Sequence, residues 1–369
     1  MKLQEIPEKL RRLRSDYGLK VLLHPEVVRN YLLHEKEKTE KPVVMSSVPW
    51  AIEIEMTNRC NLACTQCFRS KGLKPYRLGD MDPANYRQIL DQFPSAALIV
   101  LNGFGEPMMY PHFFDIVEYT HKARPWAKIG IYTNGMLIDD EKARKMMDCG
   151  LTEVSISIDA ARPETYRKVR RGGKLDVLHE NIRRLIRIKR ETKARFPHVG
   201  VNFVMVNDNE GELVPFIEQA REMGVDYVNC ISMATWDWGF GNRRFEASYR
   251  AELTAARKRL DELGMACKSF PGDSFGWADP RRTFDCNFFW GENFRVTYDG
   301  NITLGCCTPF AETFTYGNLL DQPFSEIWNN DLFRRNREMA KRGEPPVSAC
   351  ASCDAFCKRF FTAPQIGTG

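Results

Sequence analysis

The sequence has no long hydrophobic run. A membrane helix needs roughly 18 or more apolar residues in a row, whereas the longest candidates here, such as residues 96–101, are only long enough for a strand. The amino terminus is charged from Lys2 onward and has no apolar signal region. We therefore expect a cytoplasmic protein that is neither exported nor bound to a membrane.

Strong charge of one sign is also absent. Lys and Arg number 53 and Asp and Glu 48, a net charge of +5 that is modest for 369 residues. The basic clusters at 11–14 and 183–195 have helical patterns with acidic residues interspersed and no interleaved aromatics. They favour solvated helix faces over nucleic-acid contact. Internal repeats and low-complexity segments are missing as well, so the hydrophobic content of 43% is available for an ordinary globular core.

Cysteine, by contrast, is plentiful, with 12 in the chain. In a protein that is not exported, this number argues for metal or cluster ligation over disulfides. Three of them, Cys60, Cys64 and Cys67, form a C-x3-C-x2-C run directly after a predicted strand. Soft thiolates suit iron–sulfur centres, and three ligands leave one iron of a cubane open. The alternative, a structural zinc, needs a fourth Cys or His nearby, and the closest His is His112.

Short β-branched runs alternate with amphipathic helical patterns from residue 51 to about 233. Six strand–helix units in regular order predict an α/β fold with a parallel, right-handed wound sheet, a partial (β/α)6 barrel that is open on one side. We expect strands near 52–56, 97–102, 127–133, 153–158, 200–206 and 227–231, and helices near 83–93, 111–123, 139–149, 175–196 and 210–223.

Unusual residues follow the predicted strands. Because the carboxyl ends of parallel barrel strands form the active face, we expect these residues to meet at one mouth. They are Cys60, Cys64 and Cys67 after the first strand, Gly105 and Glu106 after the second, Thr133 and Asn134 after the third, Ser157 and Asp159 after the fourth, and Cys230 near the end of the sixth.

The cysteine spacing and its context resemble the radical AdoMet (radical SAM) superfamily. The resemblance implies that S-adenosylmethionine (SAM) chelates the open iron of a [4Fe–4S] cluster. One electron then splits SAM into methionine and a 5′-deoxyadenosyl radical, which abstracts hydrogen from a carbon. The family often has an aromatic residue before the third cysteine, where this chain has Gln66.

Residues 105–107 resemble the family's GGEP segment, in which the backbone and the glutamate hold the amino group of SAM. A carboxylate is a suitable charge-assisted acceptor for an ammonium. Phe104 stands between Gly103 and Gly105, so the first glycine of the usual pair is out of register. The alternative is an ordinary turn with a solvent-facing glutamate. By the same resemblance, the residues near SAM are Gly105, Glu106, Thr133, Asn134, Ser157, Asp159 and one of the neighbours Arg170 and Arg171, with Arg171 preferred as the partner of the methionyl carboxylate.

The carboxyl-terminal tail resembles the SPASM or twitch extension of radical SAM enzymes, which implies one auxiliary [4Fe–4S] cluster. Two clusters would need about eight cysteines, and the tail has six. The expected ligands are Cys286, Cys306, Cys350 and Cys353, with Cys307 an alternative to Cys306 and Cys357 an alternative to Cys350 or Cys353. A zinc ribbon is the competing use of these residues.

These motifs divide the chain into four expected parts. They are a helical extension at 1–47, the radical SAM partial barrel at 48–240, a bridging helix and linker at 241–284, and a small cysteine-rich SPASM or twitch domain at 285–369. The extension is too short for the full peptide-binding domain that many peptide-modifying relatives carry.

Three functions are consistent with these features. The first is oxidation of a secondary alcohol in a small sugar or cyclitol-like substrate, with the auxiliary cluster accepting an electron. The second is an epimerase or peptide maturase in which Cys230 donates a hydrogen atom, although a buried core thiol is the ordinary alternative. The third is a non-catalytic iron–sulfur scaffold or electron carrier. Expected partners are a small-molecule or peptide substrate and an external electron donor such as flavodoxin or ferredoxin, with no nucleic acid and no membrane.

Overall fold

The computed structural model describes residues 6–71, 77–232, 247–271, 287–291, 294–304 and 315–346. Within them lies a nine-stranded sheet of order β7-β6-β5-β4-β3-β2-β1-β8-β9, in which β8–β9 is the antiparallel pair and the other neighbours are parallel. The strands are β1 (Ala51–Ile54), β2 (Leu98–Val100), β3 (Lys128–Thr133), β4 (Glu153–Ser157), β5 (His198–Met205), β6 (Tyr227–Ser232), β7 (Cys267–Ser269), β8 (Phe294–Val296) and β9 (Ile302–Leu304).

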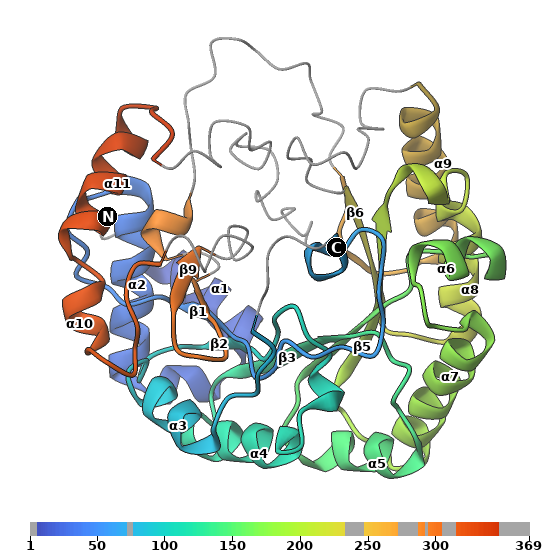
Figure 1. Ribbon diagram of the computed structural model, residues 1–369, viewed down its shortest axis with the longest axis horizontal. Coiled ribbons are helices and arrows are strands. Elements are labelled where there is room, and N and C mark those ends of the chain that lie inside the picture. Colours follow the sequence, from blue (N-terminus) through green and yellow to red (C-terminus); the bar gives the residue numbers. More distant parts are fainter. Residues whose placement is uncertain are drawn as a thin grey trace.

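Helices cover the convex face of the curved sheet, and the sheet does not close on itself (Figure 1). The predicted partial barrel is therefore confirmed. The helices are α1 (Ile6–Tyr17), α2 (Pro25–Glu40), α3 (Pro83–Asp91), α4 (Phe113–Ala123), α5 (Asp140–Asp148), α6 (Pro163–Val169), α7 (Leu175–Glu191), α8 (Leu213–Met223), α9 (Ala247–Leu263), α10 (Phe324–Ile327) and α11 (Asp331–Lys341). Among the described helices, none has the length and apolar character needed to cross a membrane.

Local signals in the sequence set the ends of several helices. Asp82 accepts a hydrogen bond from the Ala84 N–H (2.7 Å) at the start of α3, where Pro83 is the first helical residue. Gly224 ends α8 with a φ of 77°, a conformation that glycine adopts without steric cost. Strand and helix therefore alternate over this part of the chain, as predicted.

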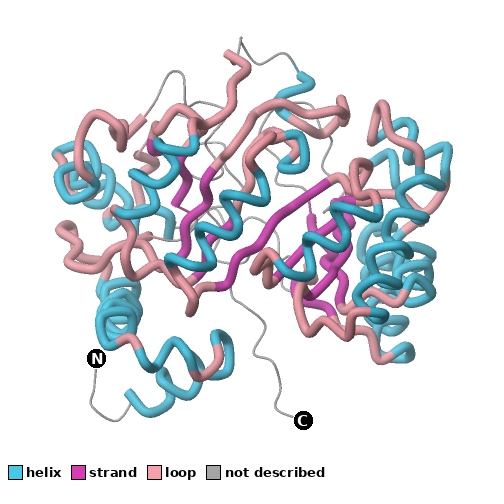
Figure 2. The backbone as a smooth tube through the Cα atoms, turned by 90° about the horizontal axis from the view of Figure 1, so that it is seen from below, coloured by secondary structure: helices cyan, strands magenta, loops and turns pink. Residues whose placement is uncertain are grey.

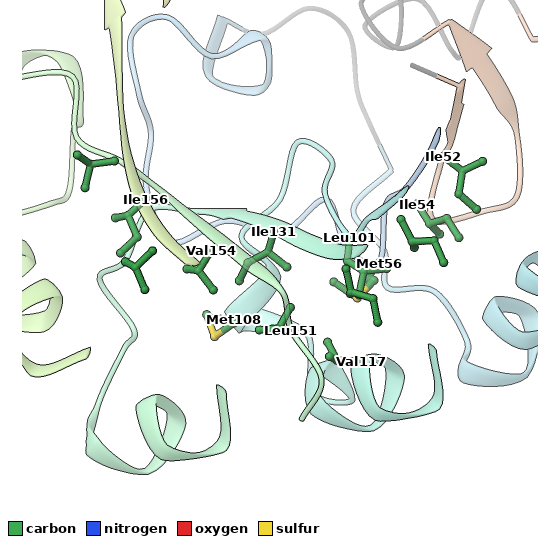
Figure 3. Close-up of a cluster of buried hydrophobic side chains, with 14 of the residues drawn as sticks. Ile52, Ile54, Met56, Leu101, Met108, Val117, Ile131, Leu151, Val154 and Ile156 are labelled. Atoms are coloured by element: carbon green, nitrogen blue, oxygen red, sulfur yellow. The ribbon is translucent and has the colours of Figure 1, made fainter. Parts of the chain in front are cut away.

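The main core lies between the sheet and the outer helices. Ile52, Ile131 and Val154 of the strands belong to this core together with Val117 of α4 (Figure 3). Figure 2 shows the strands enclosed by helices along the barrel. Side chains alternate along a strand, so every second residue faces the concave interior instead. The core therefore leaves the concave face free for polar side chains.

The amino-terminal extension is helical, as its pattern indicates, and it packs on the barrel through its own small core. Trp50, just before β1, donates to the Tyr17 hydroxyl (2.8 Å) and packs against Tyr31 of α2. Glu37 accepts hydrogen bonds from the backbone of Ser46 and Ser47, which fixes the entry into the barrel. The extension is thus attached to the start of β1.

Three strands extend the sheet beyond the six predicted ones. After α9, β7 pairs parallel with β6, although the sequence analysis assigned this region to a linker. At the other side, β8 from the cysteine-rich part pairs with β1, and β9 pairs with β8. The expected boundary near residue 285 thus separates segments that share one sheet.

Candidate active site

The loop with the three cysteines follows β1 and leads into the short 3-10 helix η3 (Phe68–Lys71). The end of α6 holds this loop in place. The Ala63 N–H donates to the Arg171 carbonyl (2.9 Å), and the Thr65 N–H donates to the Val169 carbonyl (3.0 Å). The position of α6 therefore determines where the thiols lie.

Hydrogen-bond donors surround the thiols. The Cys60 sulfur accepts from the Leu62 N–H (3.5 Å) and from the Asn134 side-chain amide (3.9 Å). The Cys64 sulfur accepts from the Arg170 guanidinium (3.6 Å). Donors and positive charge near sulfur stabilise a thiolate and tune a bound cluster. The environment of these sulfurs therefore suits metal-bound thiolates.

Burial opposes these donors, because it favours the protonated thiol over the thiolate. It raises the pKa of Cys60 and of Cys67 above the ordinary thiol value. A thiolate at these positions thus requires a cation, which a cluster iron provides. Metal binding here is coupled to loss of thiol protons.

The glycine-rich loop after β2 lies directly against the chain that leads to Cys60. A Cβ at Gly105 would be 2.2 Å from the Thr57 carbonyl oxygen, so no larger residue fits. The Glu106 N–H donates to the Arg59 carbonyl (2.8 Å). This close approach joins the two motifs into one wall of the site.

Glu106 is buried, with 2% of its surface exposed, so the alternative of a solvent-facing turn residue is wrong. Its carboxylate accepts from the Thr133 hydroxyl (2.5 Å), the Asn134 N–H (2.7 Å) and the Met108 N–H (3.2 Å). Burial raises the pKa of Glu106, and these hydrogen bonds together with Arg170 oppose that rise. Glu106 thus links the loop after β2 to the end of β3.

Asp159 provides a second buried carboxylate. It lies just after β4 and has a left-handed backbone conformation (φ 62°). Its carboxylate accepts from the Gln66 amide (2.7 Å) and the Val204 N–H (2.8 Å), and it forms an ion pair with Arg170. Burial works against the charge of Arg170, but Asp159 and Cys64 raise its pKa above the ordinary value. Gln66, the departure from the family habit, thus has a polar partner of its own.

A cavity of about 190 Å³ brings these groups together. Every barrel residue expected at the mouth is in its lining except Arg171 and Cys230. The lining includes Cys60, Cys64, Cys67, Gly105, Glu106, Thr133, Asn134, Ser157 and Asp159, together with Gln66, Phe104, Tyr132, Arg170 and Val204. The described residues contain no group of three or more His, Cys, Asp or Glu side chains arranged for a metal ion, so the fit of a cluster rests on the shared cavity and the sulfur environments.

Of the two neighbouring arginines, Arg170 lies in the cavity and Arg171 does not. The Arg171 side chain is exposed, and its carbonyl holds the cysteine loop. This geometry favours Arg170 over Arg171, and which of the two holds the SAM carboxylate stays a prediction. Both residues follow α6, a helix that the sequence did not predict, so the sequence gave no means of deciding which one turns inward.

Cys230 faces away from the cavity. It pairs with Phe203 of β5, whose ring packs on Phe216 of α8 (5.0 Å between centroids), and paired residues lie on the same face of a sheet. Cys230 is fully buried in the main core. It is not placed to donate a hydrogen atom to a substrate inside the barrel, because its strand position points it towards the helices.

The expected auxiliary ligands lie outside the described residues. They are Cys286, Cys306, Cys350 and Cys353, with the alternatives Cys307 and Cys357. Their assignment stays a prediction.

Comparison with known families decides the identity of the barrel. Residues 54–230 match the radical SAM superfamily, and residues 286–354 match the SPASM iron–sulfur cluster-binding domain. The chain belongs to the radical SAM superfamily. The resemblance read from the cysteine motifs is confirmed, and so are the cofactors that it implies, a [4Fe–4S] cluster, SAM and auxiliary iron–sulfur binding. Members of this superfamily are enzymes, so the scaffold hypothesis is set aside.

Curated relatives include proteins that modify peptides. The chain is 24% identical over 319 residues to PqqA peptide cyclase of Gluconobacter oxydans, covering 85% of this chain and 84% of that protein. It is 27% identical over 335 residues to mycofactocin maturase MftC of Mycolicibacterium smegmatis, covering 87% and 80%. A third relative, the tungsten-containing aldehyde ferredoxin oxidoreductase cofactor-modifying protein of Pyrococcus furiosus, is 34% identical over 177 residues, about half of either chain (47% and 48%).

Solved structures support the fold. Streptococcus suis SuiB bound to S-adenosylmethionine superposes with a TM-score of 0.65 at 16% identity, covering 89% of this chain and 76% of SuiB. At this identity the likeness concerns the architecture alone. It agrees with the open parallel sheet described above.

Proposed function

We propose that this protein is a radical SAM enzyme that oxidatively modifies a peptide. The observation that supports the chemistry is the cavity that gathers three thiols, Glu106 and Asp159 at the carboxyl ends of the strands. When bound, the barrel cluster supplies the electron that splits SAM into methionine and a 5′-deoxyadenosyl radical, and the auxiliary cluster accepts the electron that the substrate gives up.

The residues of the chain have distinct roles in this proposal. Cys60, Cys64 and Cys67 hold the cluster. Glu106 accepts a hydrogen bond from the SAM amino group, for which its carboxylate has a lone pair beyond those used by Thr133, Asn134 and Met108. Oriented acceptors in a buried site fix the ligand before reaction and exclude water.

Arg170 carries the positive charge opposite these acceptors. Its guanidinium is held between Asp159 and the Cys64 sulfur, and its Nε has no hydrogen-bond partner among the described residues. A carboxylate such as that of SAM satisfies a donor of this kind. Arg170 therefore takes the role first given to Arg171.

The peptide substrate is inferred from similarity. PqqA peptide cyclase and MftC match this chain over 85% and 87% of its length, through both the barrel and the tail. No relative of comparable coverage described above is named for an alcohol oxidation, so the sugar or cyclitol hypothesis is not favoured. Oxidation is preferred to epimerisation because, within the described part of the chain, the cavity has no cysteine beyond Cys60, Cys64 and Cys67.

The test is anaerobic turnover of the reconstituted protein with SAM, a reductant and short peptides encoded near its gene. We expect 5′-deoxyadenosine and a peptide whose mass falls by two hydrogen atoms. A Cys60→Ala variant serves as the control and should form neither product. Formation of 5′-deoxyadenosine with an unchanged peptide mass in ordinary water, and uptake of one deuterium by the peptide in heavy water, would instead indicate epimerisation. Conversion of cyclitols but of no peptide would reject the proposal that the substrate is a peptide.

A further inference from the structure

A buried carboxyl group with no part in the proposed chemistry lies beside the site. Glu55 follows β1 directly and has 2% of its surface exposed. One of its oxygens accepts from the Phe104 N–H (2.8 Å) and the other from the Tyr298 N–H (3.3 Å). The two donors belong to segments far apart in the sequence, so Glu55 joins them.

The first of these segments is the loop at 103–106 that carries Glu106. It is shaped around Glu55, since a Cβ at Gly103 would lie 2.2 Å from the Glu55 Cγ and Oε1. The neighbouring Gly105 is equally close to the backbone of Thr57. The loop therefore has little freedom to move without moving Glu55.

The second segment is the hairpin at 294–304, which ends two residues before Cys306 in the sequence. The Glu55 N–H donates to the Val296 carbonyl (2.9 Å), which continues the pairing of β1 with β8. Beyond it, the Tyr298 hydroxyl donates to the Arg77 carbonyl (2.7 Å), and the Tyr298 ring fills the space at Gly79. Figure 1 shows β9 of this hairpin on the same side of the sheet as β1, and in the sheet β8 lies between the two.

We infer that Glu55 is a positioning residue that couples the loop at 103–106, where SAM is proposed to bind, to the carboxyl-terminal hairpin at 294–304. A single buried carboxyl group satisfies an N–H from each segment, and a buried donor left unpaired is costly. A shift of either segment thus changes the hydrogen bond to the other. Coupling of this kind is reciprocal: SAM stabilises the hairpin, and the hairpin strengthens SAM binding. The inference rests on the proposed SAM site.

The chain offers a matched control for this role. Glu53 lies two residues earlier on β1 and accepts from the Arg295 guanidinium (2.6 Å) of the same hairpin. It has no contact with the loop at 103–106 among the interactions of the described residues. Glu53→Gln therefore weakens the attachment of the hairpin without touching the SAM loop, whereas Glu55→Gln replaces one acceptor oxygen by an amide donor.

The experiment uses the anaerobically reconstituted holoprotein and two readouts. The first is the Kd for SAM, followed by the change it causes in the electron paramagnetic resonance (EPR) spectrum of the reduced cluster. The second is hydrogen exchange of the hairpin with and without SAM. We expect Glu55→Gln to raise the Kd about tenfold and to abolish SAM-dependent protection of residues 294–304. Glu53→Gln should keep the Kd within about twofold of wild type and retain that protection.

The outcomes separate this inference from the proposed function. Wild-type Kd and wild-type hairpin protection in Glu55→Gln would overturn the coupling while leaving the SAM site intact. Absence of any SAM-dependent EPR change in the wild type would reject the site itself, and the inference with it. If Glu55→Gln does not fold, Glu55→Asp provides the test, because its shorter carboxylate keeps the charge but cannot reach both N–H groups. A wild-type response from Glu55→Asp would likewise overturn the coupling.

Discussion

Glu55 illustrates how burial can outweigh the other influences on the pKa of a single residue. Burial raises its pKa from 4.5 to about 7, although hydrogen bonds from Phe104 and Tyr298 and the charge of Arg295 lower it. Asp299 adds to the increase. At a pH between 4.5 and about 7, Glu55 is therefore protonated in the folded protein and ionised in the unfolded chain.

The pH dependence of stability follows from this shift. The contribution of Glu55 is fully present below its unfolded pKa of 4.5 and is lost as the pH rises through its folded pKa of about 7. A glutamine does not titrate. From pH 5 to pH 7 we therefore expect the free energy of unfolding of the wild type to fall by about 2 to 3 kcal/mol more than that of Glu55→Gln. Urea unfolding at both pH values measures this, and parallel pH dependence of the two proteins would contradict it.

Arg170 and Arg171 provide a second contrast between neighbouring residues. Arg170 lies in the cavity against Asp159, whereas the Arg171 side chain is exposed. Loss of a charge-assisted contact to the SAM carboxylate is expected to raise the Kd for SAM about tenfold or more in Arg170→Gln. Arg171→Gln should leave it within about twofold, since only its backbone carbonyl holds the cysteine loop. Equal effects of the two substitutions in a SAM titration would argue against this assignment.

At the scale of elements, α6 connects the chemistry to the scaffold. Glu212, at the start of α8, is 1% exposed and accepts from the Ala161 N–H (2.7 Å) and from the Arg162 N–H (2.9 Å). The Thr165 hydroxyl also donates to it. This carboxylate thus anchors the amino end of α6, whose carboxyl end holds the cysteine loop.

We expect Glu212→Gln to lower the free energy of unfolding by about 2 to 4 kcal/mol, because buried donors lose a charged acceptor. The matched control is Glu164→Gln on α6 itself, where the side chain is 73% exposed and lies 3.9 Å from Arg167. That exposed pair contributes under about 0.5 kcal/mol. Chemical unfolding of the three proteins tests the contrast, and a Glu212→Gln protein as stable as the control would refute it.

Elements with a strong local pattern were predictable from sequence, and short elements that depend on distant partners were not. Alternation in β1 and the Asp82-Pro83 start of α3 are local signals, and both elements occur as expected. The strands β7 and β8 are three residues long, and their pairing with β6 and β1 is decided by tertiary packing. The short α6 was missed for the same reason.

The candidate site followed from topology more than from any one motif. Parallel strands bring their carboxyl ends to one edge, so Glu106, Thr133 and Asp159 met in one cavity as predicted. Which face of the sheet a given strand residue occupies could be decided only from the structure. Cys230 lies at the correct strand end but on the helix-facing side, because one residue of shift exchanges the two faces.

At the scale of the whole molecule, the cysteine-rich part is joined to the barrel by a continuous sheet. The strand β8 pairs with β1, immediately before the cysteine loop. These pairings use backbone groups and none of the three thiols, so we expect them to persist when the barrel cluster is removed. Each cluster is then expected to assemble on its own ligands, and metal content measures the barrel site.

The most direct test of the account is iron and sulfide per chain after anaerobic reconstitution, in wild type and in a variant with Cys60, Cys64 and Cys67 all changed to alanine. Two [4Fe–4S] clusters predict roughly eight irons in the wild type and roughly four in the variant. The SAM-dependent change in the EPR spectrum should disappear together with these four irons. Retention of all iron in the variant, or zinc in place of iron, would contradict the central claim that these cysteines hold the SAM-binding cluster.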